Sequence, residues 1–165
     1  MRILGIDPGT ARMGWGIIEG EEEPHLVAYG TLTTPAGQAL AGRLCVLFQE
    51  LGGIVTRYQP TSAALEELFF ARNVRTAFSV GQARGVALVA LAEAGLPISE
   101  YSPLEVKQAV TGYGRADKRQ VQEMVRALLG LEELPRPDDA ADALAVALCH
   151  FHSARTQEMI RRAGG

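Results

Sequence analysis

Three apolar segments joined by short polar links open the chain, and this arrangement restricts its fold more than any other feature. Residues 1–7, 14–18 and 25–32 have the length and composition of strands. Pro8-Gly9 and the polar run 19–24 between them are typical of turns. Because such short links join antiparallel neighbours, the sequence predicts a three-stranded meander at the start of the chain.

The rest of the chain alternates helical and strand patterns. Apolar residues recur at helical spacing from Leu40 to Tyr58, and Pro60 follows that helix. Two further strands are predicted over 63–66 and 97–101, and further helices over 73–94, 102–111, 117–129 and from about 137 onward. The order predicts the α/β class, with a mixed five-stranded sheet flanked by helices.

Length and composition indicate one domain. The chain has 165 residues, of which 47% are hydrophobic and 21% charged, enough for a single packed core but not for two. One domain is therefore expected over 1–165, with a polar tail from about 153. No run is long and apolar enough for a membrane span, so we expect a cytoplasmic protein without a membrane partner. Cys45 and Cys149 lie in apolar helical patterns and are predicted to be small core residues.

Four acidic residues occupy places where an ordinary core would have aliphatic ones. Asp7 and Glu66 each end an apolar strand, and Asp139 and Asp142 share a face of the last helix because they are three residues apart. Carboxylates gathered at the ends of buried elements repel one another and lose hydration. The pattern therefore predicts a site for two Mg²⁺ ions, which prefer such oxygen ligands.

The charge distribution indicates a polyanionic partner. A net charge of −3 at first disfavours nucleic acid, since binding to phosphates depends on Lys and Arg. Basic residues nevertheless crowd the segments beside the acid-bearing ones, which predicts a basic face around an acidic pocket. These residues are Arg72, Arg75, Arg84, Lys107, Arg115, Lys118 and Arg119.

Five motifs, in order, resemble those of the RuvC family of Holliday-junction resolvases, over about residues 1–152. They are Gly5-Ile6-Asp7-Pro8-Gly9-Thr10 with Gly14-Trp15-Gly16, Leu65-Glu66-Glu67-Leu68-Phe69 with Arg72-Asn73, Gly81-Gln82-Ala83-Arg84-Gly85-Val86-Ala87, Val106-Lys107-Gln108, and Asp138-Asp139-Ala140-Ala141-Asp142. The resemblance implies an RNase H-like fold, a homodimer, and an endodeoxyribonuclease that nicks four-way DNA junctions symmetrically in recombination and repair, leaving 5′-phosphate and 3′-hydroxyl ends.

The resemblance also implies roles for particular residues. The family's catalytic, metal-binding acids fall on Asp7, Glu66, Asp139 and Asp142, with two Mg²⁺ per subunit and Mn²⁺ as a substitute. In some family members the position of Asp139 is a histidine. DNA contacts are expected from Phe69, Arg72, Arg75, Lys107, Arg115, Lys118 and Arg119. Whether the RuvA and RuvB branch-migration complex docks on this chain stays open.

Several residues also have plain structural interpretations. Asp138 alone is better explained as a first-turn acid that complements the helix dipole. Glu66 and Glu67 are expected to face opposite sides of a strand, so that only one enters the site. Cys149, His150 and His152 lack a second ligand pair at zinc spacing, so no zinc site is expected. The stripe of Gly81 and Gly85 fits either internal packing or a dimer seam, and we favour the seam.

Two other functions compete with the nuclease. Ile6-Asp7-Pro8-Gly9-Thr10 also resembles the phosphate loop of the actin, heat-shock ATPase and sugar-kinase class, which needs two such domains around a nucleotide. A related RNase H-like protein that processes RNA, or binds nucleic acid without cutting, is the second alternative. Four carboxylates favour cutting, whereas Lys107 and Lys118 do not distinguish DNA from RNA.

Overall fold

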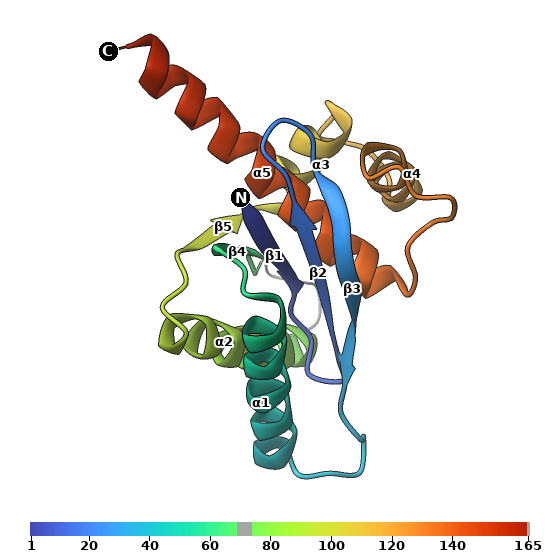
Figure 1. The fold of residues 1–165 in the computed structure, drawn as a ribbon. Helices are drawn as coiled ribbons and strands as arrows, with labels where there is room; N and C mark the ends of the chain where they lie inside the picture. The colour runs from blue at the N-terminus through green and yellow to red at the C-terminus, as the bar shows by residue number, and fades with distance from the viewer. Residues whose placement is uncertain (69–73, 165) are drawn as a thin grey trace.

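The computed structural model, which describes residues 1–68 and 74–164, has one five-stranded mixed sheet between two layers of helices (Figure 1). The strands β1 (Arg2–Asp7), β2 (Arg12–Glu19) and β3 (His25–Thr33) form the predicted antiparallel meander. The strands β4 (Ser62–Glu66) and β5 (Ile98–Tyr101) add in parallel on the other side of β1. The resulting order is β3-β2-β1-β4-β5, and the predicted fold class is confirmed.

Helices cover both faces of this sheet. The helices α1 (Leu40–Tyr58) and α2 (Val74–Glu93) pack on one face, around Leu4, Ile6 and Leu65. The helices α3 (Pro103–Thr111), α4 (Lys118–Leu128) and α5 (Asp138–Ala163) pack on the other face, around Ile3 and Ala64. The segment after His152, predicted only as a polar tail, continues α5 and projects beyond the sheet (Figure 1). None of the helices within the described residues could span a membrane.

Local capping signals place two helix starts as the sequence predicts. Ser102 accepts a hydrogen bond from the Glu105 amide, and the Glu105 carboxylate accepts one from the Ser102 amide, so that the capping box is complete. Asp117 and Gln120 make the same reciprocal pair at the start of α4. These caps fix where α3 and α4 begin beside the acidic residues.

α5 lies very close to the sheet because glycines face it. A Cβ atom on Gly5 would lie 2.1 Å from the Ala143 carbonyl oxygen, and one on Gly14 would lie 1.9 Å from the Asp139 carbonyl oxygen. From Ala140 through Phe151, every residue of α5 except Asp142 and His150 is apolar and buried. The first turn of α5 is thus held directly over the ends of β1 and β2.

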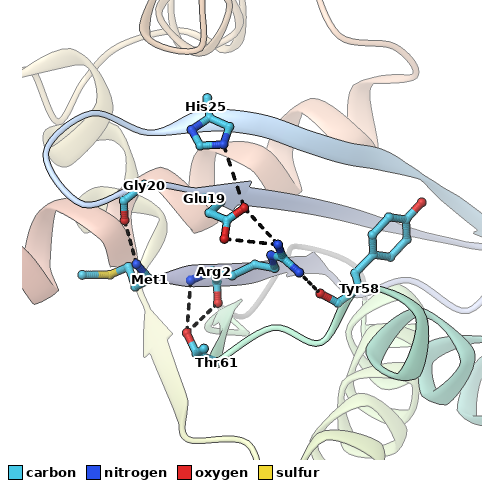
Figure 2. A network of polar contacts seen from close by, with 7 residues as sticks. All are labelled: Met1, Arg2, Glu19, Gly20, His25, Tyr58 and Thr61. Carbon is cyan, nitrogen blue, oxygen red and sulfur yellow. Dashed lines mark hydrogen bonds and ion pairs between the residues drawn. The ribbon is translucent and has the colours of Figure 1, made fainter.

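The end of the sheet away from Asp7 is tied by a polar network (Figure 2). The Arg2 guanidinium donates to the Glu19 carboxylate at 3.0 Å and to the Tyr58 carbonyl oxygen at 2.6 Å. Thr61 exchanges hydrogen bonds with the Arg2 backbone, and His25 lies 3.9 Å from Glu19. One side chain thereby joins β1 to β2 and to the last carbonyl group of α1.

Of the two cysteine predictions, one is wrong. Cys149 is buried in the core as predicted, but Cys45 is exposed. Cys45 lies in the first half of α1, whose buried residues are Leu47, Leu51 and Ile54. Apolar residues of α1 occupy more than its buried face, and Cys45 is one that lies on the solvent side.

Candidate active site

Strand pairing places Asp7 beside Glu66. β1 and β4 run parallel with Ile6 opposite Leu65, so the acids that follow these residues leave the same edge of the sheet. Carboxyl ends of parallel strands are where α/β sheets place their ligands. The predicted proximity of Asp7 and Glu66 is therefore present in the structure.

The start of α5 brings the other two acids to this edge. Pro137 precedes the helix, and Asp138 and Asp139 occupy its first turn. Asp142 follows one turn later, on the face that Asp139 also presents. The close approach at Gly14 holds the Asp139 backbone against β2, which fixes the height of this turn above Asp7.

The environment of Asp7 disfavours its negative charge. The pKa of Asp7 is raised from 3.8 to about 8, mainly by burial and then by the charges of the neighbouring carboxylates Asp142, Glu66 and Asp139. Lys118 acts in the opposite direction but does not compensate. Perturbed carboxylates in a cleft are typical of functional sites.

Glu66 and Asp142 experience the same two effects. Burial raises the pKa of Glu66, and the charge of Asp142 adds to this, whereas Lys107 and Lys118 lower it. Burial also raises the pKa of Asp142, against the hydrogen bond from Lys118. The three carboxylates are thus coupled and carry more negative charge than their surroundings neutralise.

Two basic side chains, Lys118 and Arg12, partly neutralise the negative charge of these acids. The Lys118 ammonium lies 3.0 Å from Asp142 and 3.7 Å from Asp138. The Arg12 guanidinium lies 3.3 Å from Asp139. Partial burial lowers the pKa of Lys118, but the hydrogen bond and the charge of Asp142 outweigh it and the pKa is raised. Sequence reasoning missed Arg12, because its partner Asp139 lies 127 residues away in the sequence.

Two cavities adjoin the acids. One, of about 270 Å³, is lined by Asp7, Glu66, Glu67 and the first turns of α2. The other, of about 240 Å³, is lined by Glu66, Lys107, Lys118 and Asp142. Both glutamates line the first cavity, but only Glu66 also lines the second cavity and raises the pKa of Asp7, whereas Glu67 is exposed. The expectation that one of the two enters the site stays a prediction. β4 ends at Glu66, so strand alternation no longer governs Glu67.

The donor set suits a hard divalent cation. Carboxylate oxygens are the ligands that Mg²⁺ and Mn²⁺ prefer, and a cation among Asp7, Glu66 and Asp142 would relieve the charge that raises their pKa values. Within residues 1–68 and 74–164, no three His, Cys, Asp or Glu side chains are close enough together to enclose an ion as they stand. Lys118 and Arg12 hold Asp142 and Asp139 instead.

The predicted DNA-contacting residues fall into three groups. Lys107 and Lys118 line the second cavity with the acids. Arg75, Arg115 and Arg119 are exposed on or beside α2 and α4, where Arg119 lies 3.5 Å from Glu123. Phe69 and Arg72 lie outside the described residues. Arg84, also counted in the basic face, is paired with Glu100 on β5.

The structure also accounts for the histidines of α5. His150 lies 2.8 Å from the Tyr101 hydroxyl and 3.1 Å from the Ser62 hydroxyl, and it joins α5 to β4 and β5. Burial lowers the pKa of His150, which favours the neutral ring in this network. His150 therefore has a structural environment, as the sequence predicted.

The comparisons with known proteins decide the family. The family model described as crossover junction endodeoxyribonuclease RuvC matches residues 3–150. The chain belongs to the RuvC family. The RuvC protein of Chloroflexus aurantiacus is 62% identical over 157 residues, 94% of this chain and 96% of the relative. The one from Desulfitobacterium hafniense is 57% identical and covers 100% of this chain.

Solved structures agree with this assignment. RuvC of Thermus thermophilus in complex with a Holliday junction substrate has a TM-score of 0.90 and 40% identity, covering 95% of this chain and 96% of that one. The yeast mitochondrial Holliday junction resolvase Ydc2, at 13% identity and a TM-score of 0.68, shares the fold. The predicted RNase H-like fold is confirmed, and membership of the RuvC family removes the nucleotide-binding alternative.

Proposed function

We propose that this chain is a Holliday junction resolvase, which nicks two strands of a four-way DNA junction symmetrically in recombination and repair. The observation that carries the proposal is the convergence of Asp7, Glu66 and Asp142, each with a raised pKa, at one edge of a RuvC-family fold. The products would carry 5′-phosphate and 3′-hydroxyl ends. We further propose that the enzyme acts in the cytoplasm.

We assign metal binding to Asp7, Glu66, Asp139 and Asp142. Two Mg²⁺ ions held there, or Mn²⁺ in their place, would activate an attacking water and stabilise the leaving 3′ oxygen. Asp7 interacts electrostatically with Glu66, Asp139 and Asp142, so it would hold metal together with all three. Lys118 and Arg12, which pair with Asp142 and Asp139, would be released when cations take over those carboxylates.

The basic side chains near the acids provide phosphate contacts. Lys107 and Lys118 line the cavity that contains Glu66 and Asp142, so they can hold a phosphodiester over the reacting groups. Arg75, Arg115 and Arg119, which are exposed on or beside α2 and α4, are proposed as further phosphate contacts. Phe69 and Arg72, from the motif beside Glu66, are proposed as further contacts on the strength of the family motif alone.

We propose that α2 forms the seam of a homodimer. Val74, Phe78 and Val89 are 70%, 70% and 53% exposed on this helix. Gly81 and Gly85 lie on the same stripe, and a Cβ on Gly85 would meet nothing within 4 Å. Exposed apolar residues beside small ones allow a second helix to approach closely. A dimer with RuvA and RuvB as partners agrees with the family, and its docking surface for them is not assigned.

Cleavage of a labelled mobile four-way junction beside a linear duplex of the same sequence tests the proposed activity. With Mg²⁺, we expect paired symmetric nicks on the junction alone, which EDTA and Asp7→Asn each abolish. Glu50→Gln on the exposed face of α1 is the matched control and retains full activity. Comparing Glu66→Gln with Glu67→Gln shows which of the two neighbours is required.

Other outcomes distinguish the alternatives. Tight binding of the junction without nicks in Mg²⁺ or Mn²⁺ would make this chain a binding protein. Preferential cleavage of structured RNA over the DNA junction would show that the substrate is RNA. Full metal-dependent cleavage by Asp7→Asn would remove Asp7 from the reaction.

A further inference from the structure

The buried hydroxyl of Thr10 and the half-buried hydroxyl of Ser79 connect the loop after Asp7 to α2. The Thr10 hydroxyl donates to the Ser79 carbonyl oxygen at 2.6 Å, and the Ser79 hydroxyl donates to the Thr10 hydroxyl oxygen at 2.6 Å. Thr10 is only 4% exposed, one of few buried polar residues in the described chain. Each hydroxyl thus has its partner in the other residue, across an interval of 69 positions in the sequence.

The same loop is held from a second direction. Thr34, after β3, donates its hydroxyl proton to the Thr10 carbonyl oxygen at 2.7 Å. The Arg43 side chain on α1 donates to the Thr34 hydroxyl at 2.8 Å. The backbone and the side chain of Thr10 are therefore both engaged, and the loop is fixed three residues after Asp7.

The first part of α2 has few other anchors. The buried residues of α2 are Ala83, Ala87, Ala90 and Leu91, so burial begins only at the tenth of its 20 residues. None of residues 74–82, all of which the structure describes, is buried. This first part nevertheless forms a wall of the cavity at Asp7, through Thr76, Ala77 and Val80. No residue of this part is fully buried, and the two hydrogen bonds between Ser79 and Thr10 help to hold it against the loop after Asp7.

We infer that Thr10 and Ser79 are positioning residues, which tether the first half of α2 to the loop carrying Asp7. Ser79 is adjacent to Phe78, whose exposed ring lies on the proposed dimer stripe. The tether thus links the helix proposed to join two subunits with the carboxylate proposed to bind metal in each. This inference rests on the proposed function for its effect on cleavage, but the tether itself does not.

Its test separates positioning from simple stabilisation. In the full-length protein, Thr10→Val removes the hydroxyl at nearly constant volume, and we expect faster amide hydrogen exchange over 74–82. The single-turnover rate with prebound junction should fall about 10- to 100-fold, because small displacements of a catalytic group cost that much. The junction Kd should change by less than about twofold, and Thr10→Ser should restore both rate and protection.

Two further variants keep the test decisive. Ser79 is a half-buried helical residue, and alanine has the highest helix propensity. The Ser79→Ala variant should therefore fold even if the Thr10→Val variant does not. Combining the two substitutions should cost no more than one alone, since they remove the same interaction. Thr56→Val, which loses only a bond to the Gly52 carbonyl oxygen within α1, is the control and should leave exchange over 74–82 unchanged.

Three results would overturn the inference: unchanged exchange over 74–82 in Thr10→Val, faster exchange there without a slower rate, or failure of Thr10→Ser to restore the wild-type behaviour. A wild-type protein that does not nick the junction would instead contradict the proposed function. The exchange measurement would still decide whether the tether exists.

Discussion

At the scale of single residues, Asp7 has the most perturbed environment of the four acids. Its pKa rises from 3.8 to about 8, because it is buried among other carboxylates. The folded metal-free protein therefore binds a proton at Asp7 that the unfolded chain releases above about pH 4. The stability that this proton contributes is complete below about pH 4 and is lost as the pH rises through about 8.

Asp7→Asn removes this pH dependence, because the amide is neutral at every pH. In EDTA at pH 8.5, we expect the variant to be more stable than the wild type by about 2 kcal/mol, or roughly 4 to 8 °C in Tm. The difference should disappear near pH 4, and Mg²⁺ should stabilise the wild type only. Thermal unfolding from pH 4 to 9 measures this, with Glu50→Gln as control. A less stable variant at pH 8.5 would contradict the assignment.

Arg12 competes with a cation for Asp139, given their separation of 3.3 Å. Because exposed ion pairs contribute at most about 1 kcal/mol, we expect Arg12→Gln to tighten Mn²⁺ binding by no more than about fivefold. Calorimetric titration of the DNA-free protein with Mn²⁺ measures this, with Arg155→Gln on the far part of α5 as control. Weaker Mn²⁺ binding by Arg12→Gln would show that Arg12 orients Asp139 for the metal.

The acidic residues of the site could be predicted from the sequence, but the pairing of Arg12 with Asp139 could not. Asp7 and Glu66 stood out because a carboxylate at the end of an apolar strand is costly unless something binds it. Arg12 did not stand out because its partner Asp139 is 127 residues away, and an exposed arginine on a strand is ordinary. The local sequence pattern identifies a carboxylate whose burial is unfavourable, whereas the basic side chain that pairs with an acid depends on the tertiary fold.

At the scale of elements, the contact between α5 and the sheet depends on Gly5 and Gly14. Side chains usually separate the backbone of a helix from the sheet on which it packs. Here a Cβ on either glycine would overlap the backbone of α5. The acids of α5 reach Asp7 because no side chain separates the two backbones.

The substitution Gly14→Ala should push the backbone of α5 away from β2. A Cβ there would lie 1.9 Å from the Asp139 carbonyl oxygen, so the start of α5 must move away. We expect a loss of roughly 1 to 3 kcal/mol in stability and a strong loss of cleavage. Gly53→Ala on α1, where a Cβ meets nothing within 4 Å, should instead add up to about 1 kcal/mol. Urea unfolding and junction cleavage compare the two, and equal stability of both variants would argue against the close contact.

Most element boundaries followed from local chemistry, and the pairing of elements did not. The capping boxes at Ser102 and Asp117 and the proline at 103 are contained within a few residues, so the starts of α3 and α4 were predictable. The neighbours of β1 were only half predictable: short links dictate β2, whereas β4 arrives after the whole of α1. The exposure of Cys45 also depends on how α1 is rotated against the sheet.

At the scale of the whole molecule, the exposed stripe of α2 determines how two subunits would meet. Phe78→Asp places a charge at the centre of this stripe, and we expect the dimer Kd to rise at least about tenfold. Met159→Asp, on the exposed far part of α5, is the matched control and should leave the dimer intact. Sedimentation equilibrium measures both. An unchanged Kd in Phe78→Asp would place the seam elsewhere.

α5 combines two duties that most enzymes divide among separate segments. Its alanines and leucines form the centre of the core on one face of the sheet, and its first turns carry Asp139 and Asp142. A change that enlarges or shifts its buried side would move the acids as well. In evolutionary terms, selection for folding and selection for chemistry act on the same helix, so we expect this segment to vary slowly while the exposed surface of α1 drifts.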